Sequence, residues 1–415
     1  MQVICFEDDQ VDRLRPITQA RPAYAITSAS FRLIDWVRRV PGKHNGAVRP
    51  YLEVIQELDY GLDPFTAVDE DPEGILMVNA RVAPSVSLES SLANLARQSR
   101  SVAIIDPSDQ AVLAARITAA DLAGVRGTPE PSIGQLLQLA SAATILEEPL
   151  TAFHWPHEVV AHHMREMPAA MNWRLTHEDF TERADGIFVR GKAEVGSYAA
   201  VDTSEGPILL DNGVRVGPFC YLSGPVFAGP HTRVIEHAAL KDGVALGHTV
   251  KIGGEVEASV IEPYTNKQHH GFLGHSYLGS WINLGAGTCN SDLKNTYGTI
   301  NMQYPKAKVA TNMQFLGCFI GDYSKTAINT SIFTGKVIGV CSMMYGFVTS
   351  NVPSYVNYAR LFGQTSLLPA DVMINTQERM FARRKVEQRE CDKQLIRDMY
   401  DLTADERESV DQDIL

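Results

Sequence analysis

Several features that would place a protein in a common class are missing from this sequence. No apolar run approaches the roughly 20 residues that a membrane-spanning helix needs. The first ten residues, MQVICFEDDQ, carry acids where a signal peptide has a basic region. The six cysteines form no CxxC pair, which is typical of reduced thiols. We therefore expect a cytoplasmic protein that does not enter a membrane.

Positive charge is also in deficit, because 37 Lys and Arg face 49 Asp and Glu, for a net charge of −12. This balance argues against a nucleic-acid binder, although it allows local basic groups that bind a small phosphorylated ligand. The chain nevertheless contains 45% hydrophobic residues in 415, enough for more than one folded core.

Glycine is scarce at the start of the chain and abundant later. Gly42 is the one glycine in the first 45 residues, whereas 23 of the 31 glycines fall between Gly186 and Gly346. Glycine suits tight corners and close approaches of the backbone. The glycine-poor start of the chain and the glycine-rich region after it are therefore expected to have different architectures.

Residues 1–180 are predicted to form an α/β domain. Apolar β-type runs at 3–6, 75–78 and 102–105 alternate with helix-like stretches at 31–40, 50–58, 88–98, 110–117 and 132–146. Such alternation is typical of a parallel sheet with helices on both faces. The predicted boundary lies near residue 180.

Residues 181–355 contain a hexapeptide repeat. The residues two positions before each repeat position are small or β-branched. The repeat positions themselves, every sixth residue from 210 to 258, are all aliphatic: Leu210, Val216, Leu222, Ala228, Val234, Leu240, Leu246, Ile252 and Ala258. Six residues make one short strand and one corner, and three such units close a triangular coil. The period predicts a parallel β-helix. Residues 356–415 are charged and predict a helical tail.

The repeat is interrupted twice, at 262–272 and 288–313. Interruptions of a solenoid map to loops on one face, often the binding face. The polar residues gather here, including His269, His270 and Lys267, with His275 just beyond the first break. A histidine is a natural general base for an amine or hydroxyl, and Lys binds phosphate.

The run GHSYLGSWINLGAGTCNSDLKN resembles the hexapeptide-repeat acyltransferases. It is most similar to the acetyltransferase half of the bifunctional N-acetylglucosamine-1-phosphate uridyltransferase/glucosamine-1-phosphate acetyltransferase family, whose β-helix is left-handed. The resemblance implies His275 as the base that deprotonates the sugar amine, with His269 as the alternative. It also implies substrate contacts from Lys267, Tyr277, Asn283, Asn290 and Lys294.

One departure from the family pattern bears on the base. The family's histidine precedes its tyrosine by three residues, whereas His275 precedes Tyr277 by two. In a pleated strand a slip of one residue turns a side chain to the opposite face. We therefore expect His275 to act only if the irregular stretch before it absorbs the slip.

The N-terminus carries a second resemblance, in the run RLRPITQARP at residues 13–22. It is similar to the phosphate loop of sugar-phosphate nucleotidyltransferases and implies a nucleotide or phosphate site at Arg13, Arg15, Thr18 and Arg21. The glycines and the lysine of that loop are missing. The family's Mg²⁺-binding Gly-Asp corresponds to Asn79 and its neighbours, and amide oxygen is a poor substitute for carboxylate.

Both resemblances together fit a divergent group of sugar nucleotidyltransferases related to the bifunctional enzyme. The leading hypothesis is a sugar-phosphate transferase in which the β-helix moves an acyl group from acetyl-CoA to an amino-sugar phosphate or nucleotide sugar. The resemblance implies a homotrimer and backbone amides of the GAGT turn that polarise the thioester. Partners are expected to be small molecules, without nucleic acid or membrane.

Two other hypotheses stay open. The N-terminal domain could be an active sugar-1-phosphate nucleotidyltransferase, in which case it would use Mg²⁺; or the whole chain could be a non-catalytic sugar-nucleotide-binding scaffold. No metal site is expected otherwise. The run HWPHEVVAHH at 154–163 lacks the paired histidines of zinc hydrolases and is interpreted as the start of a helix.

Overall fold

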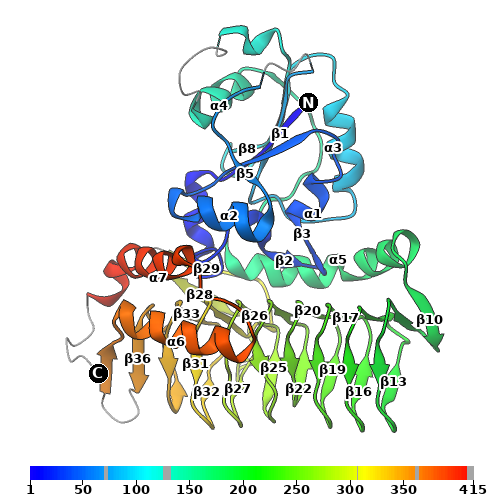
Figure 1. Ribbon diagram of the computed structural model, residues 1–415, viewed down its shortest axis with the longest axis vertical. Coiled ribbons are helices and arrows are strands. Elements are labelled where there is room, and N and C mark those ends of the chain that lie inside the picture. The colour runs from blue at the N-terminus through cyan, green and yellow to red at the C-terminus, as the bar shows by residue number, and fades with distance from the viewer. Residues whose placement is uncertain (70–72, 125–131, 306, 360–363, 409–415) are drawn as a thin grey trace. The chain divides into compact units, whose positions relative to one another are not determined.

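The computed structural model describes residues 1–69, 73–124, 132–305, 307–359 and 364–408. The chain divides into two compact units (Figure 1). The N-terminal unit comprises 1–14, 21–27 and 31–155, and the C-terminal unit comprises 15–20, 28–30 and 156–415. The helix at 156–177, which the sequence assigns to the first domain, thus groups with the repeats.

The N-terminal unit is built on one seven-stranded mixed sheet in the order β5-β4-β1-β6-β8-β7-β9. Its strands are β1 (Gln2–Phe6), β4 (Lys43–Ala47), β5 (Asp63–Pro64), β6 (Ile75–Asn79), β7 (Val102–Ile105), β8 (Val112–Ile117) and β9 (Thr144–Ile145). Its helices are α1 (Leu33–Val37), α2 (Glu53–Tyr60), α3 (Leu88–Ala96) and α4 (Ile133–Ser141), and two short strands, β2 (Thr27–Ser28) and β3 (Phe31–Arg32), pair with each other.

The α/β prediction is confirmed, but the sheet is mixed where a parallel one was expected, and one stretch was assigned to the wrong kind of element. Residues 110–117 were expected to be helical, but 112–117 form the central strand β8, which runs antiparallel to both β6 and β7. All six residues of β8 are buried. A strand covered on both faces has no polar alternation, so its sequence cannot be told from a buried helix by periodicity.

The C-terminal unit is a left-handed parallel β-helix, as the hexapeptide period predicts. Face 1 carries β10 (Thr181–Ala184), β11 (Ile187–Val189), β14 (Ile208–Leu210), β17 (Val226–Ala228), β20 (Val244–Leu246), β23 (Val260–Ile261), β26 (Tyr277–Leu278), β30 (Cys318–Ile320) and β33 (Lys336–Ile338). Figure 1 shows these short strands stacked coil upon coil.

The other two faces repeat the same stacking. Face 2 carries β12 (Glu194–Val195), β15 (Arg215–Val216), β18 (Arg233–Val234), β21 (Lys251–Ile252), β24 (Asn266–Lys267), β31 (Lys325–Thr326), β34 (Met343–Met344), β36 (Val356–Ala359) and β37 (Gln364–Leu367). Face 3 carries β13 (Ala200–Asp202), β16 (Tyr221–Ser223), β19 (Ala239–Lys241), β22 (Glu255–Glu257), β25 (Phe272–Gly274), β27 (Cys289–Asn290), β32 (Ser331–Ile332) and β35 (Phe347–Val348).

The aliphatic residues of the repeat fill the prism. Leu210, Leu222, Val234, Leu246 and Ile252 all belong to its buried core. Ala258 is the exception to the predicted register. The coil from Leu240 to Val256 is two residues shorter than the preceding one, so Ala258 lies at a corner with a positive φ of 48°. The first break therefore begins before residue 262.

Helix α5 (Pro156–His177) covers part of the outer surface of face 1. Met167 and Met171 pack on Leu209, Phe227 and Ala245, which alternate with inward-facing residues of three successive strands. This contact explains why these strands are apolar on both sides. None of the helices in the described part of the chain combines the length and apolar character needed to span a bilayer.

Two further helices, α6 (Ala370–Arg383) and α7 (Glu390–Leu402), pack on the last coils of the prism. The ring of Tyr355 meets that of Tyr400 edge-on at 5.1 Å, and its hydroxyl donates to the carbonyl of Ile396 at 2.5 Å. Trp281 lies 4.3 Å from Phe381 between ring centroids. A short antiparallel pair, β28 (Asn301–Tyr304) and β29 (Ala307–Ala310), occupies the second break.

His163 joins α5 to its surroundings as a neutral imidazole. Its Nδ1 accepts from the amide of Ala29 at 2.9 Å, and its Nε2 lies 2.9 Å from the carbonyl of Gly243. An acceptor nitrogen requires the neutral ring. Complete burial, together with the nearby His162, lowers the pKa of His163 to about 4, against the Gly243 bond that raises it.

We predict that acid destabilises the C-terminal unit through His163. Its folded pKa is about 4, below the ordinary value of 6.5, so the unfolded state binds the extra proton and stability is lost as pH falls from about 6.5 toward 4. The full effect is about 3 kcal/mol. Urea denaturation of His163→Gln should show a shallower loss between pH 7 and 4.5 than the parent, and His231→Gln, at an exposed position, should follow the parent. Identical pH slopes for His163→Gln and the parent would contradict it.

Candidate functional site

The second break of the repeat builds a histidine–carboxylate pair on the prism. The chain leaves the coil after β27 and returns before β30, and Leu293 and Phe315 form an antiparallel bridge at the base of this excursion. Asp292 stands at its start and Phe315 at its end. Both reach His275, which lies at the corner between β25 and β26.

The ring of His275 is oriented by a carboxylate and by an aromatic ring, as the imidazole of a general base commonly is. Its Nδ1 lies 2.9 Å from Oδ2 of Asp292, and its ring stacks on that of Phe315 at 5.4 Å between centroids. The side chains of His275 and Asp292 keep 15% and 13% of their surface exposed, so the pair is open to a small ligand. When Nδ1–H donates a hydrogen bond to the carboxylate, the ring presents the Nε2 lone pair to that ligand.

The backbone of His275 explains how the one-residue slip is absorbed. Its φ of +46° places it in the left-handed region, at a corner rather than in a pleated strand. Its amide donates to the carbonyl of Glu257 at 3.1 Å, and its own carbonyl accepts from the amide of Gly317 at 2.9 Å. The side chain therefore leaves the prism, while Tyr277 two residues later enters a buried strand.

Gly274 makes room for the pair. A Cβ at this position would collide with Oδ2 of Asp292 and would lie 2.5 Å from Cζ of Phe272. Only glycine allows the carboxylate to lie against the main chain next to His275. Asp292 was among the polar residues of the break, but nothing in the sequence pairs it with a residue 17 positions away.

The other residues implied by the resemblance are placed differently. Lys267 is 2% exposed, and its ammonium donates to the carbonyls of Gly253, His269 and Gly271 at 2.8, 3.3 and 2.7 Å. It aligns with Ile252 and fills an inward position of the prism. Burial lowers the pKa of Lys267 to about 8. This lysine ties the first break together, so it has no free proton to give a phosphate.

Tyr277 and Asn290 are also committed inside the protein. Tyr277 is fully buried and its hydroxyl donates to Oε1 of Glu262 at 2.5 Å. Asn290 is 5% exposed and exchanges hydrogen bonds with the amide and carbonyl of Gly274, at 2.9 and 3.0 Å. It braces the strand that ends at His275. Neither residue presents a polar group to a ligand.

Asn283, Lys294 and His269 remain accessible. Asn283 accepts from Asn266 at 2.7 Å on the outside of face 2, and His269 is exposed. Lys294 follows Asp292 by two residues, and its ammonium bonds the carbonyl of Thr299 at 2.5 Å. Burial and the charge of Lys294 lower the pKa of Lys336, a neighbouring cation that the sequence did not single out.

The GAGT turn shapes a corner instead of offering amides to a ligand. The amides of Gly285, Gly287 and Thr288 donate to the carbonyls of Thr326, His270 and Gly285. A Cβ at Gly287, whose φ is +75°, would collide with the amide oxygen of Asn329. The expectation that this turn polarises a thioester is therefore wrong for three of its four amides.

The predicted phosphate-binding residues of the N-terminus are not arranged as a phosphate loop. Thr18 is fully buried and Arg21 is 4% exposed, while Arg13 is exposed, 5.6 Å from the ring of Trp155. Arg13 and Arg21 belong to the N-terminal unit, whereas Arg15 and Thr18 group with the C-terminal unit. A phosphate site at these four residues stays a prediction.

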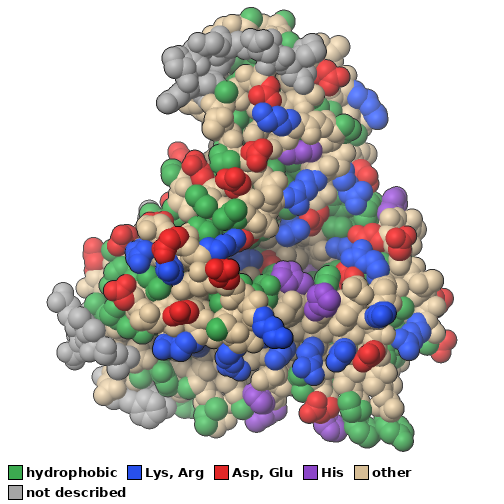
Figure 2. All heavy atoms as spheres, in the orientation of Figure 1, with side chains coloured by type: hydrophobic (Ala, Val, Ile, Leu, Met, Phe, Trp, Pro, Cys, Tyr) green, Lys and Arg blue, Asp and Glu red, His purple; other side chains and the backbone are tan. Residues whose placement is uncertain are grey.

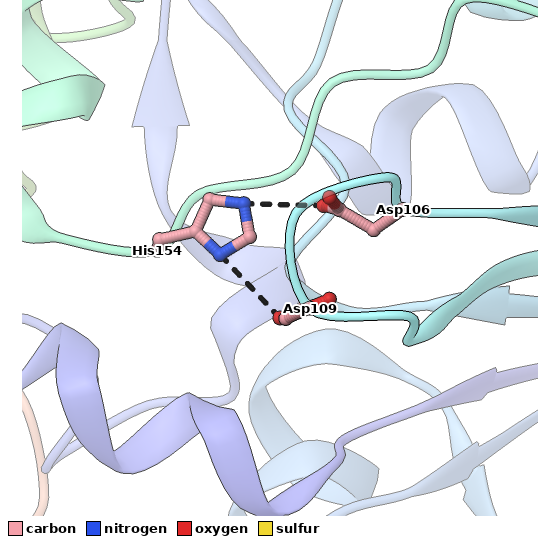
Figure 3. Close-up of side chains that lie close together, drawn as sticks. All are labelled: Asp106, Asp109 and His154. Carbon is pink, nitrogen blue, oxygen red and sulfur yellow. Dashed lines mark ion pairs between the residues drawn. The ribbon is translucent and has the colours of Figure 1, made fainter.

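A charged cluster lies instead at the ends of β1, β6 and β7. Asp106 and Asp109 flank His154, with Nε2 of His154 3.1 Å from Asp106 and Nδ1 3.5 Å from Asp109 (Figure 3). Their ligand atoms lie within 4.8 Å of one another, close enough for a metal ion. The sequence did not predict this group, because His154 comes from a different segment than the loop between β7 and β8 that carries both aspartates.

The fully buried guanidinium of Arg81 pairs with Asp109 of this cluster and with the nearby Asp8. It donates to both oxygens of Asp8 at 2.8 and 2.7 Å and to Oδ2 of Asp109 at 3.3 Å. Burial opposes ionisation of Asp8, but the bonds from Arg81 hold the pKa of that carboxyl below its usual value. Asn79 donates to Asp8 at 2.8 Å and accepts from the amide of Arg81 at 3.0 Å. The single charge of Arg81 thus balances one of the three carboxylate charges of Asp8, Asp106 and Asp109.

We predict that Arg81→Met destabilises the N-terminal unit by about 3–5 kcal/mol, because it leaves Asp8 and Asp109 as unpaired, largely buried charges. Urea denaturation followed by circular dichroism measures the loss. Arg100→Met, at an exposed position, serves as the control and should change stability by less than about 0.5 kcal/mol. Equal losses in the two variants would contradict the role of Arg81.

Comparison with known proteins agrees with both resemblances. Residues 3–176 match the model of a family described as sugar nucleotidyl transferase. The bifunctional protein GlmU of Ralstonia pickettii is 32% identical over 138 residues, and that of Herminiimonas arsenicoxydans is 34% identical over 137. Each match covers 28% of this chain and 30% of the relative, so the chain spans about a third of the length of these curated relatives.

Solved structures resemble the chain more weakly. The UDP-N-acetylglucosamine acyltransferase of Francisella novicida is 15% identical, with a TM-score of 0.27 over 53% of this chain and 78% of that one. The acetyltransferase NeuO is 14% identical, with a TM-score of 0.21 over 49% and 99%. The predicted resemblance to GlmU-like sugar nucleotidyltransferases with a hexapeptide acyltransferase domain is confirmed by the sequence matches.

Proposed function

We propose that the β-helix is an acyltransferase that moves an acyl group from acetyl-CoA to the amine of an amino-sugar phosphate or nucleotide sugar. The observation that carries the proposal is the pair of His275 Nδ1 and Asp292 Oδ2, 2.9 Å apart on an open corner of the prism. The match of residues 3–176 to the sugar nucleotidyl transferase family supports a sugar substrate. The GlmU relative, 32% identical over 138 residues, supports a transferase.

The chemistry requires one base at the acceptor amine. The amine nitrogen attacks the thioester carbonyl carbon, an N–C bond forms and the C–S bond breaks. Nε2 of His275 takes the proton that the amine loses and returns it to the departing thiolate. Asp292 keeps the ring oriented and stabilises the imidazolium through Nδ1. Lys294 and Lys336 lie near the same excursion of the chain and supply positive charge for the sugar phosphate.

We expect His275→Ala to lower kcat/KM for acetyl transfer by about 10²–10⁴-fold, because a positioned base contributes that much. Asp292→Asn should give a smaller loss, since the ring stays in place but loses its charged partner. Release of free CoA from acetyl-CoA with glucosamine 1-phosphate, or with a panel of amino sugars and their nucleotide derivatives, measures the rate.

His269→Ala is the matched control, since His269 was the alternative base and is exposed on the same break. Its rate should stay within about threefold of the parent, well below the contribution of a base. A large loss in His269→Ala with a normal rate in His275→Ala would assign the base to His269. No CoA release from any acceptor of the panel would reject the acyltransferase proposal and favour the scaffold hypothesis.

A second candidate function is nucleotidyl transfer by the N-terminal unit, favoured by its match to the sugar nucleotidyl transferase family. Such an enzyme would release pyrophosphate from a nucleoside triphosphate and a hexose 1-phosphate with Mg²⁺. Arg81 and Asn79 stand against it, because they already bond Asp8, and Arg81 also bonds Asp109 of the acidic cluster. We therefore expect no pyrophosphate release above background in a coupled phosphate assay with UTP or dTTP. Turnover that depends on Mg²⁺ would establish this activity instead.

The assembly and the location belong to the same proposal. We propose a homotrimer, which would give three equal sites under cyclic symmetry. Tyr198, Phe219 and His237 support an interface, because their rings stack along one corner at 5.1 and 5.3 Å while Tyr198 and Phe219 are 80% and 53% exposed. A cytoplasmic location is supported by the six cysteines, all of which are free thiols.

A further inference from the structure

Face 2 carries a pocket that the proposed acyl transfer does not use. It has a volume of about 260 Å³ and lies between the outer surface of face 2 and the last turn of α6. Its lining comprises Lys251, Tyr264, Asn266, Trp281, Ile282, Asn283, Lys325, Met380, Arg383 and Arg384. His275 lies elsewhere, at the corner that joins faces 3 and 1.

Four of the lining residues are cations and none is an acid. The β-helix aligns two of them, because Lys251 continues the outward row of Arg215 and Arg233, and Lys325 lies in the same row beyond Asn266 and Asn283. The end of α6 adds Arg383 and Arg384 from the side. Figure 2 shows Lys and Arg side chains gathered on the β-helical part of the surface. Within the described ranges, none of these four cations forms an ion pair with an acidic side chain.

The surroundings of Lys251 and Lys325 disfavour the charged form of both side chains. Burial lowers the pKa of Lys325 to about 8, and burial together with Arg384 and Arg233 lowers that of Lys251. Converging positive charge in one pocket is what an anionic ligand relieves.

The aromatic side chains limit what kind of anion fits. Trp281 is sandwiched between Tyr264 and Phe381, with ring centroids at 4.1 and 4.3 Å. Both of its faces are therefore occupied, and it offers a ligand only its edge. The volume also falls below the roughly 300–1,000 Å³ of sites that enclose a drug-sized ligand. The pocket has room for a compact anion but no free aromatic face for a nucleobase.

We propose that this pocket binds the diphosphate group of a small ligand, either inorganic pyrophosphate or the diphosphate of a nucleotide whose base stays outside. Four cations match the multiple charge of a diphosphate better than that of a single phosphate ester. Arginine can also bond two phosphate oxygens at once. The site is separate from the proposed acyl transfer, since its lining does not include His275 or Asp292.

Isothermal titration calorimetry of the full chain with inorganic pyrophosphate tests the proposal. The parent should bind, and the double variant Arg383→Gln/Arg384→Gln should bind at least about tenfold more weakly, as expected when charge-assisted hydrogen bonds are lost. Arg379→Gln is the matched control, because Arg379 is exposed on the same helix and does not line the pocket. Its affinity should stay within about twofold. An unchanged thermal midpoint shows that each variant is folded.

Two comparisons make the result decisive. Orthophosphate should bind at least about tenfold more weakly than pyrophosphate, because it meets fewer of the cations. UDP and ADP distinguish the source of the diphosphate: equal or tighter binding of both assigns a nucleotide, and weaker binding of both assigns free pyrophosphate. The proposal is overturned if the parent does not bind pyrophosphate, if Arg379→Gln loses as much affinity as the double variant, or if orthophosphate binds equally well.

Discussion

Coil stacking is the constraint on which the rest of the C-terminal unit depends. In a parallel β-helix each residue lies directly above its counterpart in the previous coil, so an inward side chain has only the prism interior to occupy. Leu210, Leu246 and Leu278 meet this condition with apolar side chains. A polar residue at such a position must satisfy its hydrogen bonds inside the prism, because burying it otherwise costs several kcal/mol. The constraint thus separates polar residues that brace the fold from polar residues that face a ligand.

Lys267 and Asn290 show how this constraint governs the interpretation of motifs. In the linear sequence both stand among histidines and asparagines and look like substrate contacts. In the coil both fall on inward positions, Lys267 in line with Ile252 and Asn290 in line with Ile332. Lys267 then bonds main-chain groups of its own break, and Asn290 bonds the main chain of Gly274. A residue shared with a relative's motif can therefore be there to hold an irregular coil closed, which is a structural demand as strict as a catalytic one.

The sequence predicts those parts of the fold that repeat, and it fails where the period changes. Six-residue spacing identifies the prism and most of its core, but it cannot reveal that the coil before Val256 is two residues short, so Ala258 was misplaced. It also cannot distinguish β8 from a helix, since every residue of that strand is buried. His275 was found because its neighbours resemble a motif. Asp292 and Phe315 were not found as its partners, because only the return of the chain after the second break brings them together.

The two units differ in how they treat charge, and this difference bears on function. In the N-terminal unit a fully buried arginine bonds Asp8 and Asp109, so these two carboxylates stabilise the fold. In the C-terminal unit the carboxylate of Asp292 is spent on orienting a ring that remains partly exposed, and the cations of face 2 converge without acids in their lining. Charges left uncompensated by the protein cost folding free energy and are retained where a ligand balances them. By that reasoning we place the proposed acyl transfer on the β-helix, while nucleotidyl transfer by the N-terminal unit rests on its family match.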